Sequence, residues 1–332
     1  MNPGGLLARV VRGGLVESVH LGHLVVLGPD GEEVLRVGDP DATIWPRSSL
    51  KPLQAVAMLR SGLGADARGL ALACASHSGT AAHLDVVRGV LAGAGLTEDD
   101  LQNTPDLPLD PDAAFAWRAA GRGAAALTQN CSGKHAAMLA TCVAADWDTA
   151  SYLAPDHPLQ RAVRTTVEAM TDVGVEAVTV DGCGSPLLST TVTGLARAFG
   201  AIAHAGCGSG EAGDGDLARV AAAMTTYPDL VGGPGRDVSA FMAAVPGLVA
   251  KDGAEGVYSA GLPDGSAVAF KVADGSARPR AAVLAWALAL LLGPEESTRT
   301  AIAEVGRSLV LGHGEPVGQV LAGPADEGLA AG

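Results

Sequence analysis

A serine and a lysine three residues apart, Ser48 and Lys51, stand just after Pro46 and ahead of an apolar run. The run predicts a helix, and residues three apart in its first turn share one face, so the hydroxyl and the amine would lie side by side. Serine becomes a nucleophile when a neighbouring base takes its proton, which a deprotonated amine can do. The helix start also offers unpaired backbone N–H groups to an oxyanion. The alternative is that Ser48 or Ser49 caps the helix while Lys51 lies in solvent.

Lysine is scarce in this chain, so each lysine is a candidate for chemistry. The 22 basic residues include only four lysines, Lys51, Lys134, Lys251 and Lys271. Arginine stays charged at any usable pH, whereas a buried lysine can lose its proton and act as a base. Lys251 lies in a Gly-rich turn ahead of a hairpin, where it can face the Ser48 site; alternatively it is a turn lysine in solvent. Lys271, further along that hairpin, is expected on a solvated face.

A second set of hydroxyls lies in residues 72–83, where an apolar run breaks into Ser-His-Ser-Gly before another helix. Ser76 and Ser78 are candidates for a second catalytic hydroxyl or a substrate contact. The alternative is a capping turn ahead of the helix that begins at Ala81. Which of the two serines belongs to an active site stays open at this point.

Cysteines stand at two polar corners of the chain. Cys131 and Lys134 precede an apolar helix with His135 beside them, and Cys183 follows Asp181 at the end of a β-rich run. A thiolate pair suits a soft divalent ion such as zinc. The alternative is that these cysteines are free and buried as small hydrophobic residues.

Composition excludes several classes of function. The 332 residues are 48% hydrophobic, which is enough for a substantial core in one large domain or two lobes. A net charge of −14 without clustered cations disfavours a nucleic-acid partner. The longest apolar stretch, residues 281–293, has 13 residues and is too short to cross a membrane. The first residues lack the pattern of a secretory signal, so a cytoplasmic location is expected.

The elements that must position these residues follow from periodicity and turns. Residues 23–38 and 256–275 each place two β-rich runs around a Pro-Asp-Gly turn, which predicts two hairpins. Helical spacing predicts helices over residues 53–63, 81–94, 136–144, 157–170 and 191–199. The hairpins can form one antiparallel sheet covered by a helix over residues 280–292. We therefore expect an α+β fold in a single unit of residues 1–332, with a sheet lobe roughly at 1–45 and 180–325 and a helical lobe roughly at 46–179.

Five segments, in the order RSSLKPLQ, CASHSG, NCSGKHAAML, DGCGSP and KDGAEGVY, resemble the rhizobial-type (class 3) L-asparaginases. The resemblance covers nearly the whole chain, from the Ser48 region to the terminal hairpin. It implies a fold similar to that of the serine β-lactamases, penicillin-binding proteins and serine-dependent glutaminases. The chain departs from the family at Thr80, where many members carry an acidic residue.

The resemblance implies hydrolysis of L-asparagine to L-aspartate and ammonia through an acyl-enzyme, with four catalytic residues: Ser48, Lys51, Ser78 and Lys251. It also implies a zinc ion at Cys131, Lys134 and Cys183, which organises the pocket and aids substrate binding rather than activating water. By position in these motifs Arg47 is a candidate for the α-carboxylate of the substrate and Asp181 for its α-amino group. His135 is a further candidate for substrate binding, and a homodimer is expected.

Three alternatives remain at this point. A glutaminase substrate differs from asparagine by one methylene, which a pocket discriminates by only about 1 to 3 kcal/mol. Penicillin-binding proteins and β-lactamases share the S-x-x-K pattern, but they act outside the cytosol. A non-catalytic protein that binds zinc or an amino acid would need neither serine for its function.

Overall fold

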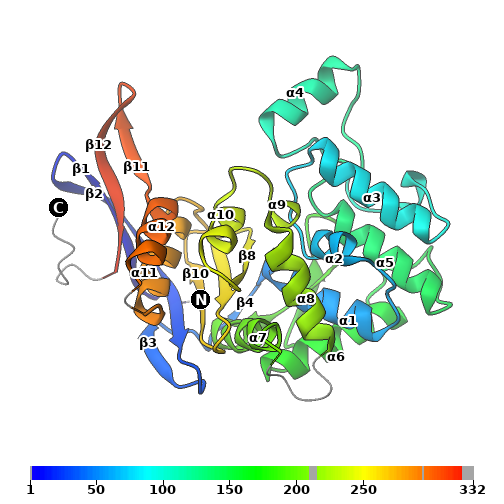
Figure 1. Cartoon of the computed structure of the whole chain (residues 1–332), viewed down its shortest axis with the longest axis horizontal. Coiled ribbons are helices and arrows are strands. Elements are labelled where there is room, and N and C mark those ends of the chain that lie inside the picture. The colour runs from blue at the N-terminus through cyan, green and yellow to red at the C-terminus, as the bar shows by residue number, and fades with distance from the viewer. Residues whose placement is uncertain (1, 209–214, 294, 324–332) are drawn as a thin grey trace.

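The fold is α+β and is built on one antiparallel sheet (Figure 1). The structure, a computed structural model, describes residues 2–208, 215–293 and 295–323. The strand order is β11-β12-β1-β2-β10-β9-β8, and β3 also pairs with β2. The strands are β1 (Gly5–Arg12), β2 (Leu15–Leu27), β3 (Glu33–Val37), β8 (Val249–Gly253), β9 (Val257–Gly261), β10 (Ala267–Val272), β11 (Leu309–Gly312) and β12 (Glu315–Ala322). Two short pairs are separate from this sheet: β4 (Thr43–Ile44) with β7 (Thr190–Thr191), and β5 (Val178–Val180) with β6 (Pro186–Leu188).

Strand β2 joins the two ends of the chain. Its first half pairs with β1, and its second half pairs with β3 and β10, as in the pair Leu24 and Phe270. The two predicted hairpins are confirmed as β2–β3 and β9–β10, and β2 places them in one sheet. Their turns carry Gly31 and Gly265 at positive φ, which glycine adopts without steric cost.

Twelve α-helices lie in the described residues. They are α1 (Lys51–Arg60), α2 (Ala67–Ala73), α3 (Ala81–Gly93), α4 (Pro111–Ala119), α5 (Ser132–Ala144), α6 (Pro158–Thr171), α7 (Val192–Ala205), α8 (Gly215–Thr226), α9 (Pro228–Val231), α10 (Asp237–Ala244), α11 (Arg280–Leu291) and α12 (Glu296–Gly306). Two 3₁₀ helices are η1 (Arg47–Leu50) and η2 (Glu98–Asp100). The five predicted helices occur as α1, α3, α5, α6 and α7 with shifted ends, and the covering helix occurs as α11.

Helices cover both faces of the sheet. Helix α7 packs on β9 and β10, and this contact is so close that a Cβ added at Gly261 would lie 2.1 Å from the carbonyl oxygen of Phe199. Helix α11 contacts β9, β10 and β12, and its Arg280 lies over the Tyr258 ring. Side chains alternate between faces along a strand, so Val257 and Ser259 point to the α7 face and Tyr258 to the α11 face.

The segment that carries Ser48 rests directly on the sheet edge. A Cβ at Gly253 would lie 2.8 Å from Pro46 O, so only glycine permits this approach of η1 to β8. Arg47, which opens η1, has φ +53°, a left-handed conformation that costs a non-glycine residue energy. Helix α1 follows with Pro52 in its first turn and is buried from Lys51 to Leu59. The catalytic candidates are thus held by the core on one side and by the sheet on the other.

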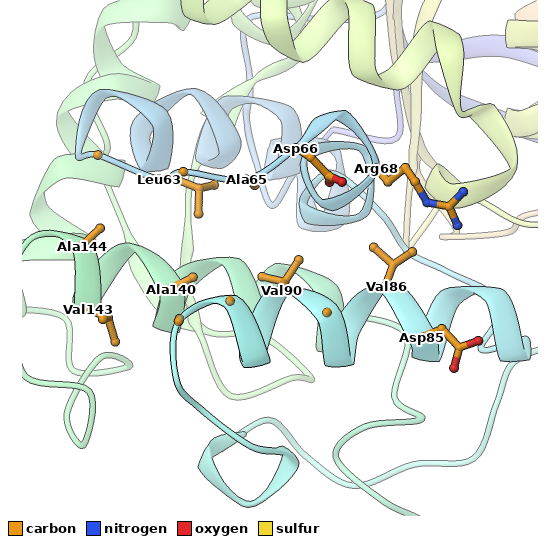
Figure 2. Close-up of a pocket in the computed structure, with 15 residues that line it drawn as sticks. Leu63, Ala65, Asp66, Arg68, Asp85, Val86, Val90, Ala140, Val143 and Ala144 are labelled. Atoms are coloured by element: carbon orange, nitrogen blue, oxygen red, sulfur yellow. The ribbon is translucent and has the colours of Figure 1, made fainter.

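A pocket of about 630 Å³ lies away from these residues, between α3, α5 and the segment that joins α1 to α2. Figure 2 shows its aliphatic walls, including Leu63, Val90 and Ala140, with Asp66 and Arg68 at one end. None of the predicted site residues lines it. No helix in the described part of the chain is long and apolar enough to span a membrane.

Candidate active site

Lys51 is buried at the meeting point of three segments. Its amine donates hydrogen bonds to Ala75 O at 2.5 Å and to Ser76 Oγ at 3.1 Å, and it lies 3.1 Å from the Cys131 sulfur. Ala75 and Ser76 follow α2, and Cys131 stands at the start of α5. With 2% of its surface exposed, Lys51 is not the solvated lysine of the alternative reading. Its amine is held among a hydroxyl, a thiol and a carbonyl.

Ser48 is half-buried in η1, one residue ahead of the buried Ser49. Within the described residues the Lys51 amine bonds to Ser76 and makes no hydrogen bond to Ser48. Catalytic hydrogen bonds often tighten only when substrate is bound, so this geometry leaves Ser48 available as the nucleophile. The Ser49 hydroxyl points elsewhere and donates to Lys251 O at 3.2 Å.

The Ser76–Ser78 segment is held on both sides by backbone hydrogen bonds. Ser76 N and Ser78 N donate to the carbonyls of Val231 and Gly232, and His77 N donates to that of Asn130. The Ser78 hydroxyl donates to Gly232 O at 3.1 Å. Ser76 is therefore the serine of this segment whose hydroxyl contacts a lysine, and the role given to Ser78 stays a prediction.

Lys251 is buried in an ion-pair network at the edge strand β8. Its amine donates to Asp252 Oδ1 at 2.5 Å, and Asp252 Oδ2 accepts from Arg236 at 2.7 Å. Arg236 also donates to Ser76 O at 3.2 Å, so the network reaches the Ser76–Ser78 segment. The side chain of Asp252 lies on the α11 face with Arg280, because it pairs with Tyr258 across the strands. The network therefore wraps around the edge of the sheet.

The charges in this network set the titration of Lys251. Burial lowers the pKa of Lys251, Asp252 raises it, and the nearby Lys51 charge lowers it, with a result of about 8. Burial alone would raise the pKa of Asp252, but Lys251, Arg236 and Arg280 outweigh burial and hold it well below its ordinary value. Lys251 is consequently an amine that can be neutral slightly above physiological pH.

Arg47 and Asp181 form an ion pair at the opening of the site. Arg47 Nε donates to Asp181 Oδ1 at 2.7 Å, and both side chains are largely buried. Asp181 begins the turn between β5 and β6, which Gly184 closes at φ +90°. The two residues predicted to bind the charged groups of an amino acid are thus brought together beside Ser48.

The predicted zinc ligands meet on the same side of the site. Lys134 Nζ lies 3.2 Å from Cys183 Sγ and 2.5 Å from Ser185 Oγ. The contact with Cys131 and the Lys134 charge lower the pKa of Cys183, although its burial opposes this. The same contact and burial raise the pKa of Cys131. Burial lowers the pKa of Lys134, but the cysteines raise it more, so Lys134 is held as the cation.

His135 lies beside this cluster and is neutral. Burial lowers its pKa to about 4, and Nδ1 lies 2.7 Å from the Tyr152 hydroxyl. An interaction with the Cys183 sulfur opposes this lowering of the pKa. A role in substrate binding stays a prediction for His135.

The chemistry of these residues fits a zinc ion in part. Two cysteine sulfurs and an amine are sulfur and nitrogen donors of the kind zinc prefers, and His135 lies beside Cys183. Cys131 and Lys134 would each release a proton on binding. No group of three or more His, Cys, Asp or Glu in the described residues could hold a metal, so the site depends on Lys134.

Several residues of the site were not singled out from the sequence. Asp252 directly follows Lys251, and this adjacency could have identified it as the counterion of the lysine. Arg236 follows a glycine-rich stretch outside the five motifs, so no sequence signal pointed to it. The prediction of a solvated Lys271 is wrong, because this residue is only 7% exposed. It lies on the face of β10 that is turned toward η1.

Comparisons with known proteins complete this description. Two solved structures of Mglu, one in its tris and glutamate form and one in its native form, match with 18% and 17% sequence identity and TM-scores of 0.39. They cover 89% and 83% of this chain, and the chain spans 65% and 66% of their lengths. No curated protein matches. The family model of L-asparaginase II matches residues 8–322, so the chain belongs to the L-asparaginase II family.

Proposed function

We propose that the protein hydrolyses L-asparagine to L-aspartate and ammonia through an acyl-enzyme on Ser48. The observation that carries this proposal is the position of the buried Lys51. It directly follows the η1 segment that presents Ser48, and its amine bonds to the Ser76 hydroxyl. A lysine amine one helical turn from a serine is placed to act as its general base. Membership of the L-asparaginase II family supports an amide as substrate.

The reaction follows from the groups of the site. Ser48 Oγ attacks the side-chain amide carbon of asparagine, and Lys51 takes the hydroxyl proton. The backbone N–H of Ser48, in the first turn of η1, is a candidate donor to the oxyanion. The proton then passes to the leaving nitrogen, the C–N bond breaks and ammonia departs. Water attacks the ester with Lys51 as base, which releases aspartate and restores the serine hydroxyl.

Arg47 and Asp181 match the charges of a free amino acid. In the structure they neutralise each other at 2.7 Å, and a zwitterion would give each a new partner of opposite charge. Arg47 would bind the α-carboxylate and Asp181 the α-ammonium group. This pairing favours an α-amino acid over a simple amide as substrate.

Cys131, Lys134 and Cys183 would hold a zinc ion. A bound zinc ion would supply positive charge and fix the turn that carries Asp181, and the serine would remain the nucleophile. This assignment explains why two cysteines and a lysine meet at the base of that turn.

Two further expectations stay proposals. A serine β-lactamase-like fold is consistent with the antiparallel sheet and its flanking helices. A cytoplasmic location is expected from the sequence, and fractionation of the source cells tests it.

Glutamine remains the second candidate substrate, because one methylene changes binding only modestly. A non-catalytic protein that binds an amino acid or zinc is the third candidate.

Replacing each serine in turn tests the nucleophile. We expect Ser48→Ala to lower the rate of ammonia release from L-asparagine by at least about a thousandfold, because the nucleophile is lost. Ser76→Ala and Ser78→Ala show which second hydroxyl assists, and Ser61→Ala, at the end of α1, is the control. Rates with L-glutamine fix the selectivity. Full activity of Ser48→Ala would contradict the mechanism, and no release from either amide would favour a binding protein.

The pH dependence of kcat tests Lys251. If Lys251 acts as a base it must be neutral, so activity should rise as pH passes about 8. Asp252 raises the pKa of Lys251, and Asp252→Asn should therefore move this rise to lower pH. The exposed Asp85→Asn on α3 is the control. A rise that stays in place or moves upward in Asp252→Asn, in protein shown to be folded by circular dichroism, would exclude Lys251 as the titrating group.

Zinc content and its effect on kinetics test the metal site. Protons on Cys131 and Lys134 compete with the metal, so zinc affinity should fall as pH falls. We expect Cys183→Ser to lose zinc in elemental analysis, and the exposed Cys207→Ser to keep it. Chelation should raise KM for asparagine and leave kcat nearly unchanged. Loss of kcat at saturating substrate would assign the metal a different role.

The expected homodimer has a candidate surface at the projecting end of the sheet. Leu15 on β2 is 77% exposed and Leu311 on β11 is 54% exposed, and apolar surface of this kind is typical of contacts between proteins. We expect Leu15→Lys with Leu311→Lys to convert the dimer to a monomer in sedimentation velocity. Phe115→Lys, on α4, should leave the dimer intact. A monomeric wild-type protein would rule out the assembly itself.

A further inference from the structure

Lys271 is a buried lysine that the proposed mechanism does not use. Its amine donates to two neutral acceptors, Glu255 O at 2.5 Å and Val272 O at 2.8 Å. In the described residues no carboxylate lies within 4.0 Å of this amine, whereas Lys251 is paired with Asp252. Burying an ammonium group without an anion is costly, so the position is suited to an anionic ligand. An ammonium group has three N–H donors, and one remains after these two bonds.

The register of the sheet places Lys271 on the face of the active site. Lys271 pairs with Val257 across β10 and β9, and Val257 pairs with Gly253 across β9 and β8. Directly opposed residues share one face of a sheet. Gly253 lies under Pro46, and Lys251 is two residues before it on the same face. Lys271 is therefore in the cross-strand row that ends beneath η1.

A pocket of about 560 Å³ opens between this row and the β5–β6 hairpin. Lys271 and Arg47 both line it, together with Trp45, Thr179, Val180 and Glu255. Arg47 precedes Ser48 directly, so the pocket adjoins the proposed nucleophile. A volume of this size accommodates a small ligand.

The charges around the pocket favour a carboxylate. Burial lowers the pKa of Lys271, and the nearby Glu255 and Asp274 raise it. The Arg47 charge also lowers it, so Arg47 and Lys271 are close enough to interact electrostatically. Arg47 bonds to Asp181 through Nε, so its terminal nitrogens remain as donors. The Glu255 carboxylate is turned toward Gly275 rather than Lys271. Two cationic donors thus face one pocket, and carboxylates bind well to such a pair.

We propose that Lys271 and Arg47 together bind the α-carboxylate of the substrate, which makes Lys271 a specificity-determining residue for free amino acids. The identity of this ligand as the substrate rests on the proposed function. The carboxylate site itself rests on the geometry of the pocket. Lys271 holds the ligand from the sheet, and Arg47 holds it from η1.

A substrate pair isolates the contact. L-asparagine amide carries a carboxamide in place of the α-carboxylate, so it loses the charge that Lys271 would bind. We expect Lys271→Met to lower kcat/KM for L-asparagine by about tenfold or more, mainly through KM, because a hydrogen bond to a charged group is lost. The same variant should change kcat/KM for the amide little. Lys271→Arg should restore most of the loss, and the exposed Arg118→Met on α4 should behave as wild type.

The outcomes separate this inference from the proposed function. If Lys271→Met lowered kcat/KM equally for L-asparagine and L-asparagine amide, the role of Lys271 would be merely structural. A wild-type enzyme with the same kcat/KM for both substrates would also overturn the carboxylate site. If wild type hydrolyses neither amide, the proposed function fails, and calorimetric titration of wild type and Lys271→Met with L-aspartate decides. Weaker binding to the variant supports the site, and equal or absent binding overturns it. If Lys271→Met does not fold, Lys271→Gln and Lys271→Arg provide the same comparison.

Discussion

The Asp252 carboxylate is the interaction on which the site depends. It is paired with both Lys251 and Arg236 in the interior, and Arg236 connects it to the Ser76–Ser78 segment. Removing one partner from a buried ion pair leaves an uncompensated charge, so these groups must be present together or not at all. The Asp252 charge also raises the pKa of Lys251, so this lysine stays cationic to higher pH. One carboxylate thus sets both the position of the Lys251 amine and its proton affinity.

Close backbone contact supports this network. Helix α7 approaches β9 at Gly261, and η1 approaches β8 at Gly253, so each element meets the sheet where a side chain is missing. The site is consequently formed from segments distant in sequence but fixed relative to one another. Lys51 at the start of α1 can meet Ser76 because α1 is buried along almost its whole length.

The sequence predicted the elements whose signals are local. The Pro-Asp-Gly turns located both hairpins, and helical spacing located α1, α3, α5, α6 and α7. It did not predict the first half of β2 or the β11–β12 pair, because strands of mixed polarity lack a clear period. Residues from separate motifs do meet in the structure, as Lys51 meets Cys131, Lys134 meets Cys183 and Arg47 meets Asp181. The motifs could not show that the Lys51 amine turns to Ser76, or that Arg236 completes the network, because these contacts depend on tertiary packing.

The prediction of a solvated Lys271 was wrong for the same reason, because the elements that pack on a strand face decide whether its side chains are exposed. It also reveals a property of the whole molecule. All four lysines are buried, and the described surface carries its positive charge on arginine. Reagents that acylate or crosslink primary amines therefore find no lysine on the folded surface. Modification of lysine side chains in the native protein would report on opening of the interior, and side-chain attachment chemistry for this protein must use other residues.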